Sequence, residues 1–413
     1  MMADDNSENA AVVVIGGGVL GCSIAWHLAR GGETDVVVLE RNDIGSGATA
    51  RSAGLVSRGR LHVETLRLVR RTREAIAELE ATTREPIGFH RVGSVRVAAS
   101  EEREAELAAM DGLLREHGVE VRSIDAQEAR DRVPWLDASR ARHVSYVEDD
   151  GYVDAHQLTS AYARAARALG VRIRARTSAE RILHDGQRLL GVATCRGRIH
   201  AGNVVDAGGA WGIGLAAGLG FALAAAPVRS HYWITAPERT GAREHPVVYL
   251  PDVRVYARPE VGGLLIGVQE PLSRTYDARL LPDDIGDFVF SDADDDWSVL
   301  IDHAPALRAY IPRLDELPLA HHIMGLSTYT PDGRFILGRA GSVDGFYVAG
   351  GCCGTGVSAS GGIGEALASL ILGDSPKVDL APFHPDRFGA VDPYDAAFRE
   401  LCAAARGGKS RRM

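Results

Sequence analysis

The chain has 413 residues, a length typical of two or three structural units around a large enclosed core. Hydrophobic residues make up 46% and charged residues 24%, which excludes a disordered, collagen-like or disulfide-stapled chain. The net charge of -9 argues against a broad surface for nucleic acid, and no nucleic-acid partner is expected.

Nearly all cations of the chain are arginines, because Lys377 and Lys409 are its only lysines. A mechanism that needs a buried lysine with a shifted pKa therefore has almost no candidates. The cysteines are too few and too scattered for a disulfide framework, and no cluster has metal-ligand spacing. The acidic N-terminus lacks the basic region of a secretory signal, and no apolar run reaches the roughly 20 residues of a membrane span. We expect a cytoplasmic protein without a membrane span or a metal.

In chain order, the first segment indicates a βαβ unit. A buried strand at 11–15 leads into three glycines and a helix over 22–30, and a second apolar strand at 36–39 ends on Glu40. The later pattern predicts further elements: helices over 63–81, 101–117 and 155–169, strands at 91–98, 171–174 and 203–207, antiparallel strands within 228–268, an acidic loop with helices within 283–311, a strand at 346–349 and a helix over 361–372. The last residues, 406–413, have the composition of a frayed tail.

Dinucleotide-type signals alternate with sheet-rich segments along the chain. We expect an α/β fold with a Rossmann-like dinucleotide-binding domain and an inserted α+β substrate domain built on an antiparallel sheet. The expected dinucleotide-binding domain is discontinuous and comprises residues 1–85, 145–225 and 325–413. The expected substrate domain comprises residues 86–144 and 226–324.

The Gly-rich turn near the start of the chain indicates a dinucleotide site. In Gly16-x-Gly18-x-x-Gly21, the first glycine permits a tight turn, the second lets a pyrophosphate approach the backbone, and the third allows close packing of helix on strand. The helix N-terminus supplies N–H donors to phosphate, and Glu40 accepts hydrogen bonds from ribose hydroxyls. A Gly-rich turn without a ligand is the alternative, but the strand, helix and acid at matching offsets argue against it.

FAD and nicotinamide dinucleotides share this fold, and three features favour FAD. The motif opens the chain, and the strand at 204–207 ends in Gly208 and Gly209, where small residues let the backbone lie against a flat ligand. The Gly-rich segment 350–364 opens a second helix, whose N-terminus suits the negative edge of a reduced flavin. A nicotinamide-dependent dehydrogenase is therefore disfavoured.

Together these segments resemble the D-amino-acid oxidase-like flavoproteins, whose members include glycine oxidase, sarcosine oxidase and dimethylglycine dehydrogenase. The resemblance covers about residues 11–375, with the motifs in family order. The matching segments are VVVIGGGVLGCSIAWHLA and VVVLER at the start, GSGATARSAGL (45–55), DDGYVDAHQL (149–158), VVDAGGAW (204–211), YARPEVGGLLIG (256–267), TPDGRFILG (330–338) and FYVAGGCCGTG (346–356).

The resemblance implies an FAD-binding Rossmann-like domain of the glutathione-reductase type, bound FAD, and a substrate that is an amine or amino acid, with secondary, N-methyl or cyclic amines favoured. Hydride transfer from the carbon next to nitrogen to flavin N5 forms an imine, and oxygen or an electron-transfer acceptor takes the electrons. The residues expected at the cofactor are Gly16, Gly18, Val19, Leu20, Gly21, Glu40, Arg41, Gly47, Ala48, Thr49, Arg51, Ser52, Ala53, Gly54, Leu55, Ala179, Ala207, Gly208, Trp211, Gly325, Gly351, Gly354, Thr355, Gly356, Val357 and Ser358.

Two positions bear on how the flavin is held. Gly325 stands where monomeric sarcosine oxidases attach FAD to a cysteine, and Arg51 stands where the dimethylglycine dehydrogenase branch attaches it to a histidine. We therefore expect noncovalent FAD, with Cys352 and Cys353 as alternative attachment points.

The expected cationic anchors for a substrate carboxylate are also missing. The carboxylate-binding lysine of sarcosine oxidase falls at Ser358, and the arginine of glycine oxidase falls at Ser327. The oxygen-activating lysine of sarcosine oxidase falls at Leu265. Either another arginine holds the carboxylate, or the substrate is not a simple amino acid.

Four residues are candidates for the substrate side. Tyr256 matches a tyrosine that lines the sarcosine oxidase site, Gln269 falls at a site histidine, and His231 falls on a strand that crosses toward the ring. Arg51 follows the ribose acid and suits a place over the flavin or against an anionic substrate. Alternatively, Tyr256, Gln269 and His231 are structural residues of their strands. Arg51 could instead bind a phosphate or form a structural ion pair.

The sequence leaves other functions open. The same fold suits an FAD-dependent oxidase or dehydrogenase of 2-hydroxy acids, or an FAD-binding subunit of a larger complex, and the sequence is compatible with an oligomer. The histidines at 321–322 and the acidic run at 292–296 have the pattern of solvated surface.

Overall fold

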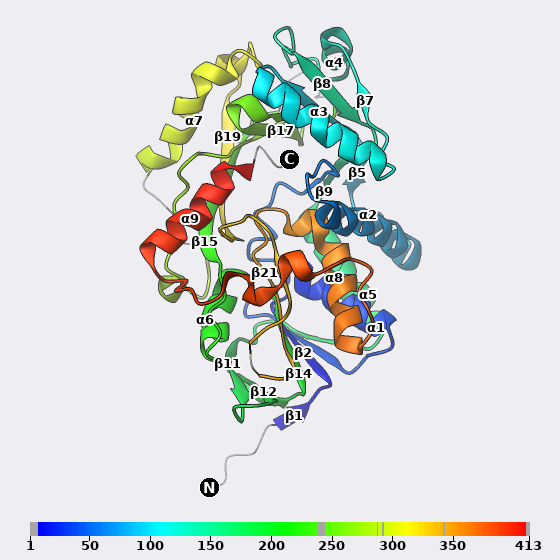
Figure 1. Cartoon of the computed structure of the whole chain (residues 1–413), viewed down its shortest axis with the longest axis vertical. Helices are drawn as coiled ribbons and strands as arrows, with labels where there is room; N and C mark the ends of the chain where they lie inside the picture. Colours follow the sequence, from blue (N-terminus) through cyan, green and yellow to red (C-terminus); the bar gives the residue numbers. More distant parts are fainter. Residues whose placement is uncertain (1–6, 238–243, 287, 291–292, 342, 410–413) are drawn as a thin grey trace.

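The computed structural model describes residues 7–237, 244–286, 288–290, 293–341 and 343–409 (Figure 1). One end of the molecule holds a parallel sheet and helices α1 (Val19–Arg30), α5 (Ala155–Ala168) and α8 (Gly356–Leu372). The other end holds a larger sheet and helices α3 (Glu101–Glu116), α4 (Ala126–Arg132) and α7 (Ala293–Leu307). The red helix α9 (Ala396–Gly407) lies beside β15 (Ala226–Thr235) and β19 (Leu319–Tyr329), so residues from the C-terminal region pack on the larger sheet.

A six-stranded sheet forms the centre of the first part. Its order is β10 (Arg172–Arg174), β3 (Val36–Leu39), β2 (Val12–Ile15), β14 (Asn203–Asp206), β21 (Phe346–Gly350) and β20 (Ile336–Arg339). All neighbouring strands are parallel except the edge pair β21 and β20. Parallel strand ends lie at one edge, which brings the Gly-rich turn after β2 next to the loop after β14.

The two faces of this sheet are both covered, which explains its continuous apolar strands. Val12 and Val14 pack with α1, α5, α8 and the long helix α2 (Val63–Thr83). Val13 and Ile15 point to the opposite face, where they pack with a small sheet and α6 (Gly212–Ala217). That small sheet has the order β1 (Ser7–Asn9), β13 (Gly197–His200), β12 (Leu189–Thr194) and β11 (Ala179–His184).

An eight-stranded sheet forms the second part. Its order is β19 (Leu319–Tyr329), β15 (Ala226–Thr235), β18 (Gly263–Val268), β17 (Val255–Glu260), β16 (Val247–Leu250), β6 (Ser94–Ala98), β8 (His143–Val147) and β7 (Arg122–Ser123). The short strands β4 (Leu55–Val56), β9 (Gly151–Val153) and β5 (Phe89–His90) form a third sheet. The mixed α/β class expected from the sequence is confirmed, whereas the limits of the two domains stay a prediction.

The structure corrects three expectations from the sequence. The helix expected over 361–372 begins at Gly356, so its N-terminus lies closer to the Gly-rich loop. The prediction of a frayed tail is wrong for residues 406–409. Arg406 is buried in α9 (Ala396–Gly407), and the Lys409 ammonium donates to the carbonyl oxygen of Gly354.

The third correction concerns His322, which is not solvated surface. Its ring stacks on Trp233 with 4.9 Å between centroids. His321 is exposed, as expected, and the acidic run 292–296 begins outside the described residues. Within the described residues, no helix has the length and apolar character needed to cross a bilayer.

Candidate functional site

A cavity of about 260 Å³ lies where the turns of the parallel sheet meet strands β15, β17 and β19 and the residue that follows β18. Its walls include all of the residues expected at the cofactor except Gly21, Gly351 and Thr355. The four expected substrate-side residues also line it: Arg51, His231, Tyr256 and Gln269. Residues predicted from segments far apart in the sequence therefore meet in one place, although their individual roles stay predictions.

The Gly-rich turn has the geometry that a phosphate cradle needs. Gly16 has a φ of +104°, and a Cβ there would lie 2.4 Å from the carbonyl oxygen of Ala207. Gly21 does not line the cavity, and its Cβ would lie 1.9 Å from the carbonyl oxygen of Gly16. Both positions require glycine, one for the turn and one for the close approach of α1 to β2.

Glu40 is held at the cavity by backbone donors. One carboxylate oxygen accepts from Gly17 N at 2.8 Å, and the other accepts from Asn42 N at 2.9 Å. The hydroxyl of Thr49 accepts from Val19 N at 3.1 Å and closes the first turn of α1. These residues fit FAD: the α1 N-terminus and its glycines would receive the pyrophosphate, and Glu40 would receive ribose hydroxyls.

The two positions linked to covalent attachment in relatives face each other. A Cβ at Gly325 would lie 2.8 Å from Cβ of Arg51. The Arg51 guanidinium donates to the carbonyl oxygen of Ile285 at 3.1 Å, while its buried Nε has no hydrogen-bond partner among the described residues. Neither position carries a nucleophile, which supports noncovalent FAD, and a donor without a partner remains at the cavity.

A short segment before α7, residues 282–285, contributes to the cavity wall and contacts two residues expected at the cofactor. The indole of Trp211 donates to the carbonyl oxygen of Pro282 at 2.9 Å, and Arg41 pairs with Asp283 at 3.0 Å. Asp284 and Ile285 line the cavity directly. Sequence reasoning missed these two residues because their segment has no motif of its own.

A buried charge network lies behind His231. Its Nε2 lies 3.3 Å from Glu270 Oε2, and its Nδ1 lies 3.3 Å from Nε2 of His322. Glu270 also pairs with Arg406, which bonds the hydroxyl of Ser273 at 2.8 Å. Burial lowers the pKa of His231, so the ring is neutral near pH 7 and both of its nitrogens face protein groups. Burial alone would raise the pKa of Glu270, but Arg406 and His231 lower it far below its ordinary range.

Three tyrosines line the cavity: Tyr232, Tyr256 and Tyr329. Burial raises the pKa of Tyr256 far above its ordinary range and raises the pKa of Tyr232 to about 12. Burial also raises the pKa of Tyr329 to about 12. All three hydroxyls therefore stay protonated near neutral pH and can donate hydrogen bonds to a ligand.

Besides Arg406, which pairs with Glu270, two further cations at the cavity were missed by sequence reasoning. Arg60 comes from the loop after β4, and Lys409 follows α9. The sequence shows no motif at either residue, and Lys409 stood in the segment expected to be frayed. The strong arginine bias also hid Arg60 among many similar residues.

The comparisons with known proteins agree with this site. The family described as FAD dependent oxidoreductase (DAO) matches residues 11–370, and the chain belongs to this family. Its members bind FAD and include amine and amino-acid dehydrogenases and oxidases.

Two relatives and one solved structure illustrate the likeness. The chain is 30% identical to dimethylglycine dehydrogenase of Rattus norvegicus over 92% of this chain and 45% of that protein. It is 29% identical to 4-methylaminobutanoate oxidase (formaldehyde-forming) of Paenarthrobacter nicotinovorans over 93% of this chain and 46% of that protein. It superposes on L-proline dehydrogenase of P. horikoshii with a TM-score of 0.82 and 26% identity, covering 92% and 98% of the two chains. The chain spans about half the length of the curated relatives it matches.

Proposed function

We propose that this protein is an FAD-dependent enzyme that oxidises the C–N bond of an N-methyl or cyclic secondary amine, with N-methyl amino acids as the favoured substrates. The observation that carries the proposal is the cavity itself, where a dinucleotide cradle meets a wall of protonated tyrosines and cations. The named activities of the two relatives, both on N-methyl compounds, support this substrate class.

When bound, FAD supplies the acceptor for the hydride that leaves the carbon next to nitrogen. This transfer requires a neutral substrate nitrogen. Arg51, Arg60 and Lys409 line the cavity without ion-pair partners among the described residues, so their positive charges disfavour a protonated amine and favour loss of its proton.

The chain's own residues then orient the substrate. The hydroxyls of Tyr232 and Tyr256 remain protonated and can donate to it. His231 is fixed between Glu270 and His322, so we assign it a positioning role at the wall rather than proton abstraction. Asp284 and Ile285 form part of the cavity wall, and contacts of the preceding residues with Trp211 and Arg41 hold this segment in place.

The test is product analysis. The FAD-loaded protein is incubated with sarcosine, N,N-dimethylglycine and proline, with either oxygen or an artificial electron acceptor, and the products are separated. We expect formaldehyde together with the demethylated amino acid from the N-methyl substrates, or the cyclic imine from proline. Oxidation of 2-hydroxy acids with no product from any amine would contradict the proposal and select the hydroxy-acid alternative.

A further inference from the structure

Arg60 is a buried arginine without a counter-ion. Its side chain is 6% exposed, and its guanidinium donates to the carbonyl oxygen of Gly59 at 2.7 Å and to the hydroxyl of Ser358 at 3.4 Å. Its Nε has no hydrogen-bond partner, and no carboxylate among the described residues lies within ion-pair distance. A guanidinium has five N–H donors, so most of its capacity is unused.

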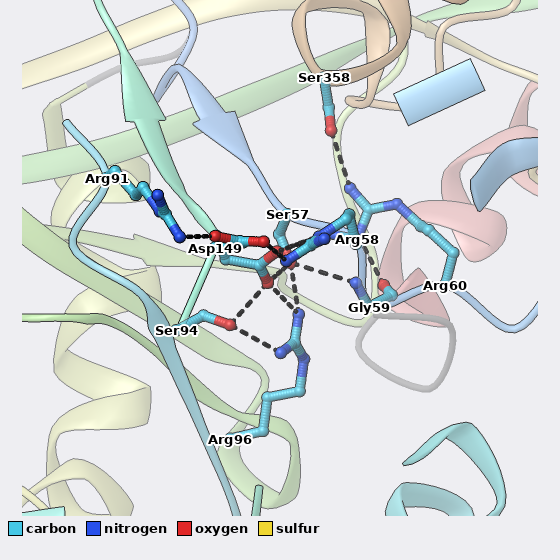
Figure 2. Close-up of polar contacts among 10 residues, drawn as sticks. Ser57, Arg58, Gly59, Arg60, Arg91, Ser94, Arg96, Asp149 and Ser358 are labelled. Atoms are coloured by element: carbon cyan, nitrogen blue, oxygen red, sulfur yellow. Dashed lines mark hydrogen bonds and ion pairs between the residues drawn. The ribbon is translucent and has the colours of Figure 1, made fainter. Parts of the chain in front are cut away.

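The carboxylates that contact the loop carrying Arg60 already have arginine partners. Figure 2 shows Arg58, Arg91 and Arg96 converging on the acidic pair at 149–150, while Arg60 extends away from them toward Ser358. Arg60 is therefore the surplus cation of this region. Burial lowers its pKa, which reflects a guanidinium that has lost water without gaining an acid.

Lys409 brings a second positive charge to the same place. Its ammonium donates to the carbonyl oxygen of Gly354 at 2.7 Å, and no carboxylate among the described residues pairs with it. Burial and the charges of Arg60 and Arg406 lower the pKa of Lys409 to about 7. Lys409 and Arg60 both line the main cavity, and both also line a small cavity of about 40 Å³ beside it. Two partly desolvated cations close together repel each other when no anion is present. A bound anion that accepts hydrogen bonds from both would relieve this repulsion.

We propose that Arg60 and Lys409 form the anion-binding end of the cavity and hold the substrate's carboxylate, so that the enzyme selects amino acids over uncharged amines. This inference rests on the proposed function. It also explains how a carboxylate is held although positions 327 and 358 carry serines, because the Arg60 guanidinium donates a hydrogen bond to Ser358 itself.

The direct test uses a carboxylate that cannot be oxidised at a C–N bond. Furan-2-carboxylate and its uncharged match furan-2-carboxamide are titrated into the FAD-loaded protein, and binding is followed by calorimetry and by the flavin difference spectrum. We expect Arg60→Gln and Lys409→Met each to weaken furan-2-carboxylate binding by about 10-fold or more, as the loss of a charge-assisted hydrogen bond predicts. Furan-2-carboxamide binding should stay unchanged, and Arg60→Lys should recover part of the loss.

Matched controls separate the site from total charge. Arg91→Gln and Lys377→Met each remove one exposed, ion-paired cation outside the cavity and should leave furan-2-carboxylate binding unchanged. Wild-type affinity in both Arg60→Gln and Lys409→Met would overturn the proposal. A loss confined to Arg51→Gln would also overturn it, because it would assign the carboxylate to Arg51.

The cofactor is the competing source of negative charge. If the two cations serve the flavin ring or its phosphates, the variants will change the flavin reduction potential or FAD affinity while furan-2-carboxylate binding stays at the wild-type value. That result would overturn the proposal. Failure of the proposed function is distinguishable: it would leave the Arg60-dependent binding of furan-2-carboxylate intact while no amine reduces the flavin.

The pH dependence gives a second readout. Furan-2-carboxylate binding should weaken as the pH rises from about 6 to about 9, because Lys409 loses its proton. The other groups facing the ammonium are Arg60, Arg406, Tyr329 and Cys353, and burial raises the pKa of both Tyr329 and Cys353 above this range. His62 also lines the small cavity, so His62→Gln is the control. The pH dependence should disappear in Lys409→Met and persist in His62→Gln; the opposite pattern would contradict the assignment to Lys409.

Discussion

Two groups of cations lie near each other in this protein and differ in whether an acid neutralises them. In the acidic-pair cluster (Ser57, Arg58, Arg91, Ser94, Arg96, Asp149 and Asp150), every arginine has a carboxylate partner (Figure 2). At the cavity, Arg60 and Lys409 have none among the described residues. The same side-chain chemistry therefore serves two purposes: matched charges join parts of the fold, and unmatched charges remain available for a ligand.

The largest expected effect breaks the matched side of this comparison. Arg96→Met leaves the fully buried Asp150 with only Arg58 as a cationic partner, so we expect the free energy of unfolding to fall by about 3 kcal/mol or more. Arg60→Met removes no ion pair and should cost much less, which chemical denaturation of both FAD-loaded variants will measure. Equal losses would show that the distinction between matched and unmatched cations is wrong.

The second prediction converts a matched cation into an unmatched one. Glu270→Gln strips the acid from Arg406 and from His231, so we expect a loss of about 2 kcal/mol in the free energy of unfolding. The isosteric amide keeps the packing, which separates charge from volume. An unfolding free energy equal to the wild type would mean that Arg406 does not depend on Glu270.

The acid side of the stability profile follows from Asp150. Burial would raise its pKa, but Arg96 and Arg58 lower it below the ordinary value, so the unfolded chain binds a proton at a higher pH than the folded protein does. Its stabilising contribution is complete above about pH 5 and is lost as the pH falls through about 4 and below. Thermal unfolding of wild type and Arg96→Met against pH should show a shallower acid loss in the variant; parallel curves would contradict this.

The smallest expected effect concerns Lys409. Its folded pKa of about 7 lies below that of an exposed lysine, so the unfolded chain holds a proton that the folded protein lacks between these values. The stability of the wild type should therefore rise relative to Lys409→Met as the pH increases from about 7 to about 10, by about 1 kcal/mol after allowance for solvent. Lys377→Met is the control, because Lys377 is exposed. A stability difference that does not change with pH would contradict the lowered pKa of Lys409.

The cofactor half of this protein could be predicted from the sequence because its determinants are local. Gly16, Gly18 and Glu40 act through the backbone turn and the strand in which they stand, and the structure places them at the cavity. The late helix begins earlier than expected, since Thr355 and Gly356 continue directly from the Gly-rich loop.

The cationic end could not be predicted because its residues come from distant parts of the chain. Arg60 has no local pattern that separates it from Arg58, and only the fold shows which of the two meets an acid. Lys409 stood in a polar tail whose composition indicated fraying, yet α9 packs on β15 and β19 and carries it to the cavity. The sequence also predicts His322 to be solvated, because its stacking partner Trp233 lies on a neighbouring strand and is distant in the sequence.

Anaerobic reduction of the flavin shows whether this cavity oxidises an N-methyl or cyclic secondary amine with FAD. The FAD-loaded protein is titrated anaerobically with sarcosine, N,N-dimethylglycine and proline while the visible flavin spectrum is recorded, and dithionite serves as the positive control. We predict that at least one of these amino acids bleaches the flavin, and that its uncharged amide analogue does so far less well. If dithionite reduces the flavin but none of these amines bleaches it, the result would contradict the proposed oxidation of N-methyl or cyclic amines.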